Sequence, residues 1–151
     1  MKPPRPAQPA AGRSCTFCRI IGGEAPAFAV FEDALAYAFL DHRPLLKGHV
    51  LLTPKAHRET LQDLPEDAVG PLFRIARMLC GAVERAMAAD GSFLAINTRI
   101  SQSVPHLHIH VVPRWRKDGL FSPKLVWKRQ PYRDEAEMRA VQEAIRREIR
   151  A

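Results

Sequence analysis

The sequence predicts an α+β fold, in which an antiparallel sheet of about five strands packs against two main helices. Candidate elements follow one another in the order β-β-β-α-β-β-α, and the links between neighbouring strands have hairpin length, which favours antiparallel pairing. Two long segments repeat their apolar residues with the 3.6-residue period of a helix, whereas residues 106–112 alternate with the period of a strand. At 151 residues the chain is long enough to bury a core as one domain.

The first half of the chain supplies an arm and three strands. Residues 1–14 are rich in proline and alanine, so we expect a disordered arm followed by an ordered domain over residues 15–151. The domain opens with a short helix that Gly22-Gly23 ends. Strands are predicted at Ala29–Glu32, Ala36–Leu40 and His49–Thr53, with turns at Glu32-Asp33, Arg43-Pro44 and Lys47-Gly48.

The second half supplies both main helices. Leu64-Pro65-Glu66-Asp67 opens a helix to about Ala89, with an apolar stripe formed by Leu72, Ile75, Ala76, Leu79, Val83 and Met87. Asp90-Gly91 then turns the chain into a strand at Phe93–Asn97. The last helix begins with Asp134 as N-cap and Glu137 at the capping-box position, and it runs to about Arg150 with Met138, Val141, Ile145 and Ile149 inward.

The net charge of +7 and the pI near 9.8 raise the question of an anionic partner. Basic residues gather in the last helix and between Arg114 and Arg133, where they form either solvated faces or a surface for a phosphate-bearing substrate. Nucleic-acid binding is the less favoured alternative, because the aromatic residues of this region fit a base or leaving-group pocket equally well.

No apolar run approaches the roughly 20 residues of a membrane span. The first residues carry basic side chains but lack the apolar segment of a secretory signal, and the chain has three cysteines. We therefore expect a cytoplasmic protein without a membrane partner.

The segment His106-Leu107-His108-Ile109-His110-Val111-Val112 is the most informative part of the sequence. Alternation along a strand places all three imidazoles on one face, about 6.5–7 Å apart, and the aliphatic residues on the other. A half-buried strand with histidine by coincidence is a poor explanation, because buried imidazoles need partners. Three imidazoles on one rigid face indicate metal ligands or a catalytic array.

A second motif, Cys15-Thr16-Phe17-Cys18, has C-x-x-C spacing. Such spacing is found in redox pairs, in metal sites and by coincidence, and a redox pair is disfavoured because no preceding strand suggests a βαβ unit. Zinc requires four nitrogen or sulfur ligands, so two more are needed; His57 and one histidine of the 106–110 run are the candidates.

With these motifs in place, the sequence resembles the histidine triad (HIT) family, over nearly the whole of residues 15–115. The matching blocks, in family order, are residues 15–24, Phe39-Leu40-Asp41, Lys47-Gly48-His49-Val50-Leu51, Pro54-Lys55-Ala56-His57, Asn97 and residues 102–114. The resemblance implies a HIT-like fold that pairs into a homodimer with a continuous sheet. It also implies an enzyme that binds nucleotides and cleaves phosphoanhydride or phosphoramidate bonds at the α-phosphorus.

The resemblance also implies roles for individual residues. His108, the middle histidine, is the nucleophile that takes the nucleotidyl group, a role that suits imidazole near neutral pH. His110, Gln102 and Ser103 hydrogen-bond the α-phosphate, and Gln102 and Ser103 also meet the leaving group and the bridging oxygen. Asp41 and Asn97 meet the ribose and nearby phosphate. His49 is expected beside the triad as support.

In the metal-binding branch of the family, the residues that correspond to Cys15, Cys18, His57 and His106 bind one structural zinc ion, which has no open coordination position for hydrolysis. One departure concerns substrate preference. Many members carry glycine directly before the block that begins at Gln102 and have a glycine-containing loop upstream of it, where this chain has Thr98-Arg99-Ile100-Ser101. We expect this bulkier, charged loop to narrow the phosphate channel or to add a cation.

The sequence leaves two functions open. The leading interpretation is a nucleotide hydrolase or nucleotidyl transferase acting on a dinucleoside polyphosphate or nucleoside phosphoramidate through a covalent histidine intermediate. The alternative is a nucleotide-binding regulatory module with vestigial catalysis, suggested by the basic stretch and the proline-rich arm.

Overall fold

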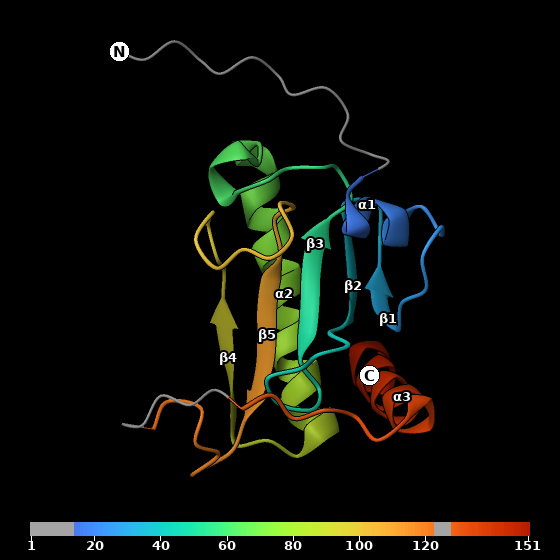
Figure 1. The fold of residues 1–151 in the computed structure, drawn as a ribbon, viewed down its shortest axis with the longest axis vertical. Coiled ribbons are helices and arrows are strands. Elements are labelled where there is room, and N and C mark those ends of the chain that lie inside the picture. The colour runs from blue at the N-terminus through green and yellow to red at the C-terminus, as the bar shows by residue number, and fades with distance from the viewer. Residues whose placement is uncertain (1–13, 123–127) are drawn as a thin grey trace.

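A computed structural model describes residues 14–122 and 128–151; the predicted arm, apart from Ser14, lies outside the described residues, as do residues 123–127. The elements are α1 (Thr16–Ile21), β1 (Ala29–Glu32), β2 (Ala36–Leu40), β3 (Val50–Pro54), a 3-10 turn (Leu61–Asp63), α2 (Glu66–Met87), β4 (Gly91–Ala95), β5 (Ile109–Arg114) and α3 (Glu135–Arg150). The five strands form one sheet in the order β1-β2-β3-β5-β4, and every neighbouring pair is antiparallel. The predicted α+β architecture is confirmed (Figure 1).

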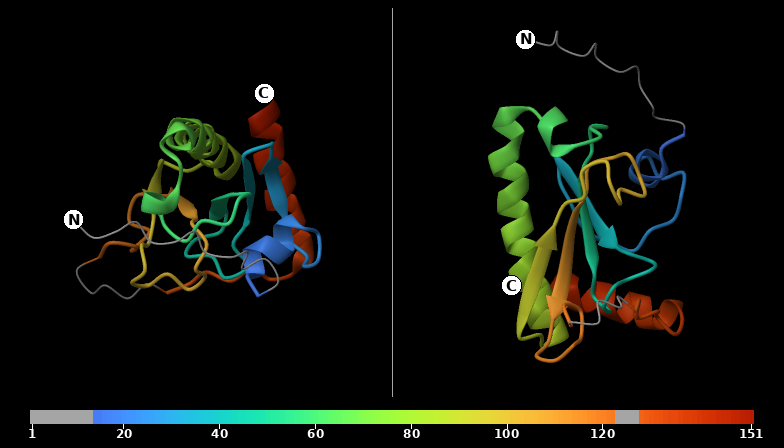
Figure 2. Two further views of the ribbon diagram at one scale, coloured as in Figure 1. Left: turned by 90° about the horizontal axis from the view of Figure 1, so that it is seen from above. Right: turned by 60° about the vertical axis from the view of Figure 1, so that its left-hand side comes forward.

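One face of the sheet packs into the main hydrophobic core, and the other face carries the candidate site. On β3, Val50 and Leu52 enter the main core with α2, whereas Leu51 turns to the opposite face and packs near α1. The same alternation places Leu107, Ile109 and Val111 in the main core. The three triad histidines therefore leave the apolar core and project toward the α1 side of the sheet, as the period of two predicts. Figure 2 shows α2 and α1 on opposite sides of the sheet.

The boundaries of four elements differ from the sequence-based prediction. Strand β3 spans Val50–Pro54 instead of His49–Thr53, and β4 ends at Ala95 instead of Asn97. Helix α2 ends at Met87 because Ala88 adopts a left-handed conformation (φ 47°). Strand β4 begins at Gly91 rather than at Phe93, since its pairing with β5 starts where Gly91 faces Arg114. Strand β5 begins only at Ile109, because the preceding backbone bonds elsewhere: Leu107 N–H donates to the Arg58 carbonyl (2.6 Å) and Thr53 Oγ1 donates to the Leu107 carbonyl (2.8 Å).

Helix α3 covers β1 and packs beside α2. Ile145 is fully buried, and Met138, Val141 and Ile149 pack against the main core as predicted. Asp134 caps the helix by accepting from Glu137 N–H (2.8 Å). The return bond of the predicted capping box is displaced by one residue, because the Glu137 carboxylate accepts from the N–H of Arg133 (2.7 Å).

None of the described helices has the length and apolar character needed to cross a membrane.

Candidate active site and metal centre

Four side chains from distant parts of the chain converge on the α1 side of the sheet. The ligand atoms of Cys15, Cys18, His57 and His106 all lie within 4.8 Å of one another. Cys15 is the N-cap of α1 and Cys18 lies within this helix, whereas His57 follows β3 and His106 precedes β5. The structure thus brings together the four residues that the sequence predicts as metal ligands.

The spacing of these atoms fits a tetrahedral ion. The Nδ1 atom of His106 lies 3.4 Å from Cys15 Sγ and 3.6 Å from Cys18 Sγ, and Cys18 Sγ lies 3.3 Å from His57 Nδ1. Zinc bonds of about 2.0–2.3 Å in tetrahedral geometry separate neighbouring ligands by about 3.3–3.8 Å. The donor set of two thiols and two imidazoles is one that zinc prefers.

The protonation of His106 also suits a ligand. Its Nε2–H donates to the carbonyl of Pro54 (2.8 Å), and a carbonyl can only accept. In the neutral ring, Nδ1 therefore presents its lone pair to the two thiols. Burial is the main cause that raises the pKa of Cys18 to about 11, and the neighbouring Cys15 adds to the shift. A cation is therefore needed to hold this sulfur as a thiolate at neutral pH.

His108 lies next to the candidate metal site, and a backbone carbonyl fixes its tautomer. Its Nδ1–H donates to the carbonyl of His106 (2.7 Å), which leaves the lone pair on Nε2. His108 as a whole is 4% exposed, and the ring of Phe17 packs against its ring edge to face with 5.1 Å between the centroids. Burial lowers the pKa of His108 below 6.5, so the ring is neutral at physiological pH. His106 thus contributes a ring nitrogen to the candidate metal site and a carbonyl to His108.

A fourth histidine, His49, contacts the ring of His110. The backbone N–H of Leu45 donates to His49 Nδ1 (3.2 Å), so the neutral His49 ring carries its proton on Nε2. His49 Nε2 lies 2.9 Å from His110 Nδ1 and donates to it. His110 then carries its proton on Nε2, and this atom is buried without a hydrogen-bond partner among the described residues. A buried, unpaired N–H is suited to receive an oxygen atom of a ligand.

Both rings of this pair stay neutral. Burial is the main cause that lowers the pKa of His49 to about 3 and that of His110 to about 4. The Asp41 carboxylate opposes both shifts and lies 3.6 Å from His49 Nδ1. Asp41 also accepts from the N–H of Arg43 (2.8 Å), so it shapes the loop between β2 and β3.

The remaining predicted substrate residues lie in or beside the loop upstream of His106. Gln102 bridges this loop, because its side-chain oxygen accepts from Arg99 N–H (2.8 Å) and its amide donates to the Glu59 carbonyl (2.6 Å). Ser103 is exposed and Asn97 is half-buried. Within residues 14–122 and 128–151, neither makes a hydrogen bond to the triad.

The departure from the family pattern in this loop is visible in the backbone. Arg99 and Ser101 have φ values of 66° and 60°, a conformation that glycine adopts without strain. The loop therefore keeps a glycine-like path while it carries the Arg99 side chain and the 84% exposed side chain of Ile100.

Two features of the site were not predicted from the sequence. Phe17 covers His108; its position between the two cysteines of the C-x-x-C motif could have indicated a place near the metal. The backbone N–H of Leu45 sets the His49 tautomer. The types of the side chains in a sequence do not indicate which backbone N–H group will be the donor.

Comparison with known proteins agrees with this geometry. The HIT domain model matches residues 22–117. An uncharacterized HIT-like protein from Mycobacterium tuberculosis is 39% identical over 134 residues, which cover 87% of this chain and 92% of the relative. An adenosine 5'-monophosphoramidase from Saccharomyces cerevisiae is 39% identical over 110 residues, covering 71% and 67% respectively. An adenylylsulfatase from Arabidopsis thaliana is 34% identical over 110 residues, 72% of this chain and 56% of the relative.

Solved structures share the fold over almost the full chain. A zinc-bound histidine triad family protein from Mycobacterium smegmatis superposes with a TM-score of 0.75 at 36% identity, covering 91% of this chain and 96% of that one. A histidine triad nucleotide-binding protein from Sulfolobus tokodaii gives 0.79 at 31% identity, with 90% and 92% covered. Together with the cluster of Cys15, Cys18, His57 and His106, these matches show that the chain belongs to the HIT family and fits its metal-binding C-x-x-C branch.

Proposed function

We propose that this protein is a nucleotidyl hydrolase or transferase that cleaves at the α-phosphate of a dinucleoside polyphosphate or nucleoside phosphoramidate. The observation that carries the proposal is the hydrogen bond from His108 Nδ1 to the His106 carbonyl (2.7 Å). It leaves the Nε2 lone pair of a neutral, buried imidazole as the nucleophile. The relatives named as a monophosphoramidase and an adenylylsulfatase support adenylyl conjugates as the substrate class.

In the proposed first step, His108 Nε2 attacks the α-phosphorus and forms a P–N bond. The bond from phosphorus to the leaving group breaks, and the leaving group departs with the bonding electron pair and takes a proton from solvent. In the second step, water attacks the phosphorus and gives up a proton to solvent, the P–N bond breaks and His108 regains its lone pair. A different acceptor in place of water gives transfer rather than hydrolysis.

The proposal assigns the substrate oxygens to groups around His108. The unpaired Nε2–H of His110 donates to an α-phosphate oxygen, and the fixed orientation of this donor avoids reorganisation during the reaction. Gln102 and Ser103 meet the phosphate and leaving group at the upstream loop. Asp41 and Asn97 meet the ribose and the nearby phosphate.

We also propose that Cys15, Cys18, His57 and His106 hold one structural zinc ion. When bound, zinc supplies folding energy and holds the His106 ring, whose carbonyl in turn orients His108. With four protein ligands it takes no part in the chemical step. Free cysteines are consistent with a cytoplasmic location, and a homodimer remains part of the proposal.

The proposal is tested with adenosine 5'-phosphoramidate, adenylyl sulfate and diadenosine polyphosphates as substrates. We expect the wild-type protein to release AMP from at least one of them and His108→Ala to lose at least a thousandfold in kcat while it keeps its fold. His42→Ala, which changes an exposed histidine, serves as the control. Saturable AMP binding with no turnover, or with turnover that His108→Ala leaves unchanged, would favour the regulatory-module alternative.

A further inference from the structure

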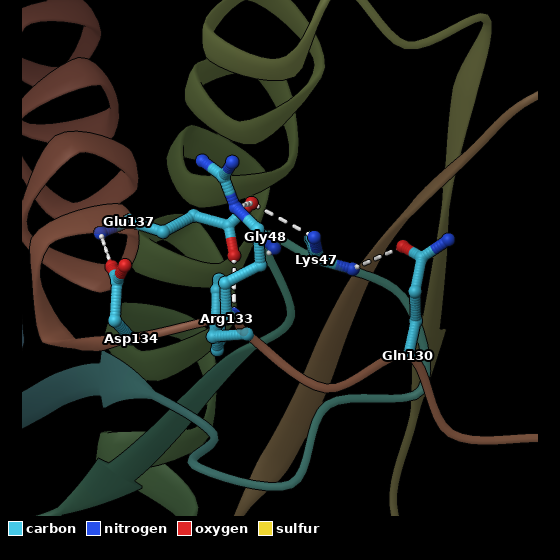
Figure 3. Close-up of polar contacts among 7 residues, drawn as sticks. Lys47, Gly48, Gln130, Arg133, Asp134 and Glu137 are labelled. Atoms are coloured by element: carbon cyan, nitrogen blue, oxygen red, sulfur yellow. Dashed lines mark hydrogen bonds and ion pairs between the residues drawn. The ribbon is translucent and has the colours of Figure 1, made fainter.

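Residues 129–137 lie outside the 22–117 match to the HIT domain and cross the loop between β2 and β3. We call these residues the brace and residues 43–48 the β2–β3 loop. The brace runs from Arg129 to Glu137, and its last residues form the first turn of α3. Figure 3 shows Gln130 and Glu137 on two sides of Lys47, with Arg133 and Asp134 at the start of the helix.

The brace contacts the loop at its two ends, through residues 43–44 and residues 47–48. The Gln130 side chain accepts from Lys47 N–H (3.1 Å), the Gln130 N–H donates to the Pro44 carbonyl (3.1 Å), and Arg129 donates to the Arg43 carbonyl. Tyr132 Oη accepts from Gly48 N–H (3.0 Å). Two backbone N–H groups and two backbone carbonyls of the loop therefore have their hydrogen-bond partners in the brace.

One ion pair fixes the brace to the loop by side chains. Lys47 Nζ donates to the Glu137 carboxylate at 2.8 Å, and the other carboxylate oxygen accepts from the N–H of Arg133. Glu137 thus connects the loop, the brace and the start of α3. The inner side of the loop is anchored separately, because Leu45 and Leu46 are buried with Val112 and Leu120.

The position of this loop determines which ring nitrogen carries the proton in His49 and, through His49, in His110. Its Leu45 N–H is the donor that places the His49 proton on Nε2, and His49 in turn donates to His110. A lengthening by about 1 Å would break the 3.2 Å bond from Leu45, since this bond is already at the upper end of the usual donor–acceptor range. His49 would then be free to carry its proton on either nitrogen.

We propose that Gln130, Tyr132 and Glu137 are positioning residues, which hold the β2–β3 loop so that His49 and His110 each keep their proton on Nε2. The brace acts through the loop and does not touch the substrate. The consequence for turnover rests on the proposed function, whereas the consequence for the histidine protons does not.

The experiment measures both consequences separately. Long-range ¹H–¹⁵N correlation spectra report which ring nitrogen of each histidine carries the proton, without any substrate. The variants are Tyr132→Phe and Glu137→Gln, singly and together. Their matched controls are Tyr37→Phe, which changes the other tyrosine, and Glu135→Gln, which neutralises an exposed glutamate in the same turn of α3.

In the wild-type protein and both controls we expect His49 and His110 to be protonated on Nε2. In the double variant we expect mixed tautomers at both rings, and kcat lower by about three- to tenfold with KM changed less than twofold. Each single variant should give a smaller shift of the same kind, so the test survives if the double variant does not fold.

Wild-type tautomers in folded brace variants, whatever their thermal stability, would overturn the proposal. So would a wild-type His49 that carries its proton on Nδ1. If the tautomers change as expected but no substrate is turned over, the brace is confirmed and the proposed function fails.

Discussion

The Nε2 atom of His49 lies 2.9 Å from the Nδ1 atom of His110, and this contact decides which nitrogen of His110 carries a proton. His49 precedes β3 and His110 lies on β5, so strand pairing of Leu51 with His110 brings the two rings together. The contact leaves the buried Nε2–H of His110 available to a phosphate oxygen.

Replacing His49 with phenylalanine keeps a ring but removes the donor to His110. His110 then no longer has a fixed tautomer, and we expect kcat for the cleaved nucleotide to fall about tenfold, equivalent to about 1.4 kcal/mol. Steady-state kinetics check this result against His42→Phe at an exposed position. A kcat within twofold of the wild-type value would show that the contact does not matter for catalysis.

Stability should depend on pH through the same pair. Burial lowers the pKa of His49 from 6.5 to about 3 and that of His110 from 6.5 to about 4. The unfolded chain therefore binds more protons below pH 6.5, and the folded state loses stability as the pH falls from about 6.5 toward 4. Each histidine should contribute about 1–2 kcal/mol to the loss between pH 6.5 and 5.

Denaturant unfolding at these two pH values, in the presence of excess zinc, measures this loss. His49→Gln should be less sensitive to pH than the wild-type protein, whereas His42→Asn should match it. Equal sensitivity in His49→Gln would contradict the assignment of a neutral, buried His49.

We expect about one equivalent of zinc per chain, because the four candidate ligand atoms lie within 4.8 Å of one another. These atoms belong to Cys15, Cys18, His57 and His106. Cys15→Ser and His57→Ala should each lower the zinc content below one half equivalent and lower the melting temperature by several degrees. Elemental analysis and calorimetry measure both effects. Cys80→Ser, at the cysteine outside this cluster, is the control and should retain its zinc.

Gly48 should tolerate no side chain. Its φ is +94°, and an added Cβ would lie 2.7 Å from Cγ of Met87 on α2. We expect Gly48→Ala to lower the free energy of unfolding by about 2–4 kcal/mol through strain and overpacking. Gly91→Ala is the matched control, since its Cβ would meet nothing within 4 Å, and it should change stability far less.

Strand β4 is the last strand of the sheet order, and Leu94 on it is 39% exposed. An edge strand of this kind can pair with a second copy, which supports the predicted homodimer with a continuous sheet. We expect light scattering to give twice the 17.0 kDa chain mass for the wild-type protein and the single mass for Leu94→Asp. A wild-type monomer at micromolar concentration would refute the dimer.

The sequence alone predicts the fold class and the sides of the sheet on which its key residues lie. Alternation along residues 106–111 separates His106, His108 and His110 from Leu107, Ile109 and Val111, because each strand residue reverses the direction of its side chain. The apolar stripes of α2 and α3 place one side of each helix against the core, because residues three and four apart lie on the same side of a helix. The four candidate metal ligands were also predicted from residue type and family motif, and the structure brings them together.

Only the tertiary structure decides the protonation and orientation of the site. The Pro54 carbonyl orients His106, the His106 carbonyl orients His108, and the Leu45 N–H orients His49. These partners are backbone groups, which every residue carries, so no residue type marks them in a sequence. The brace was missed for a related reason. Gln130, Tyr132 and Glu137 contact the β2–β3 loop 83–90 residues away in the chain, and such contacts arise only when the sheet and α3 pack together.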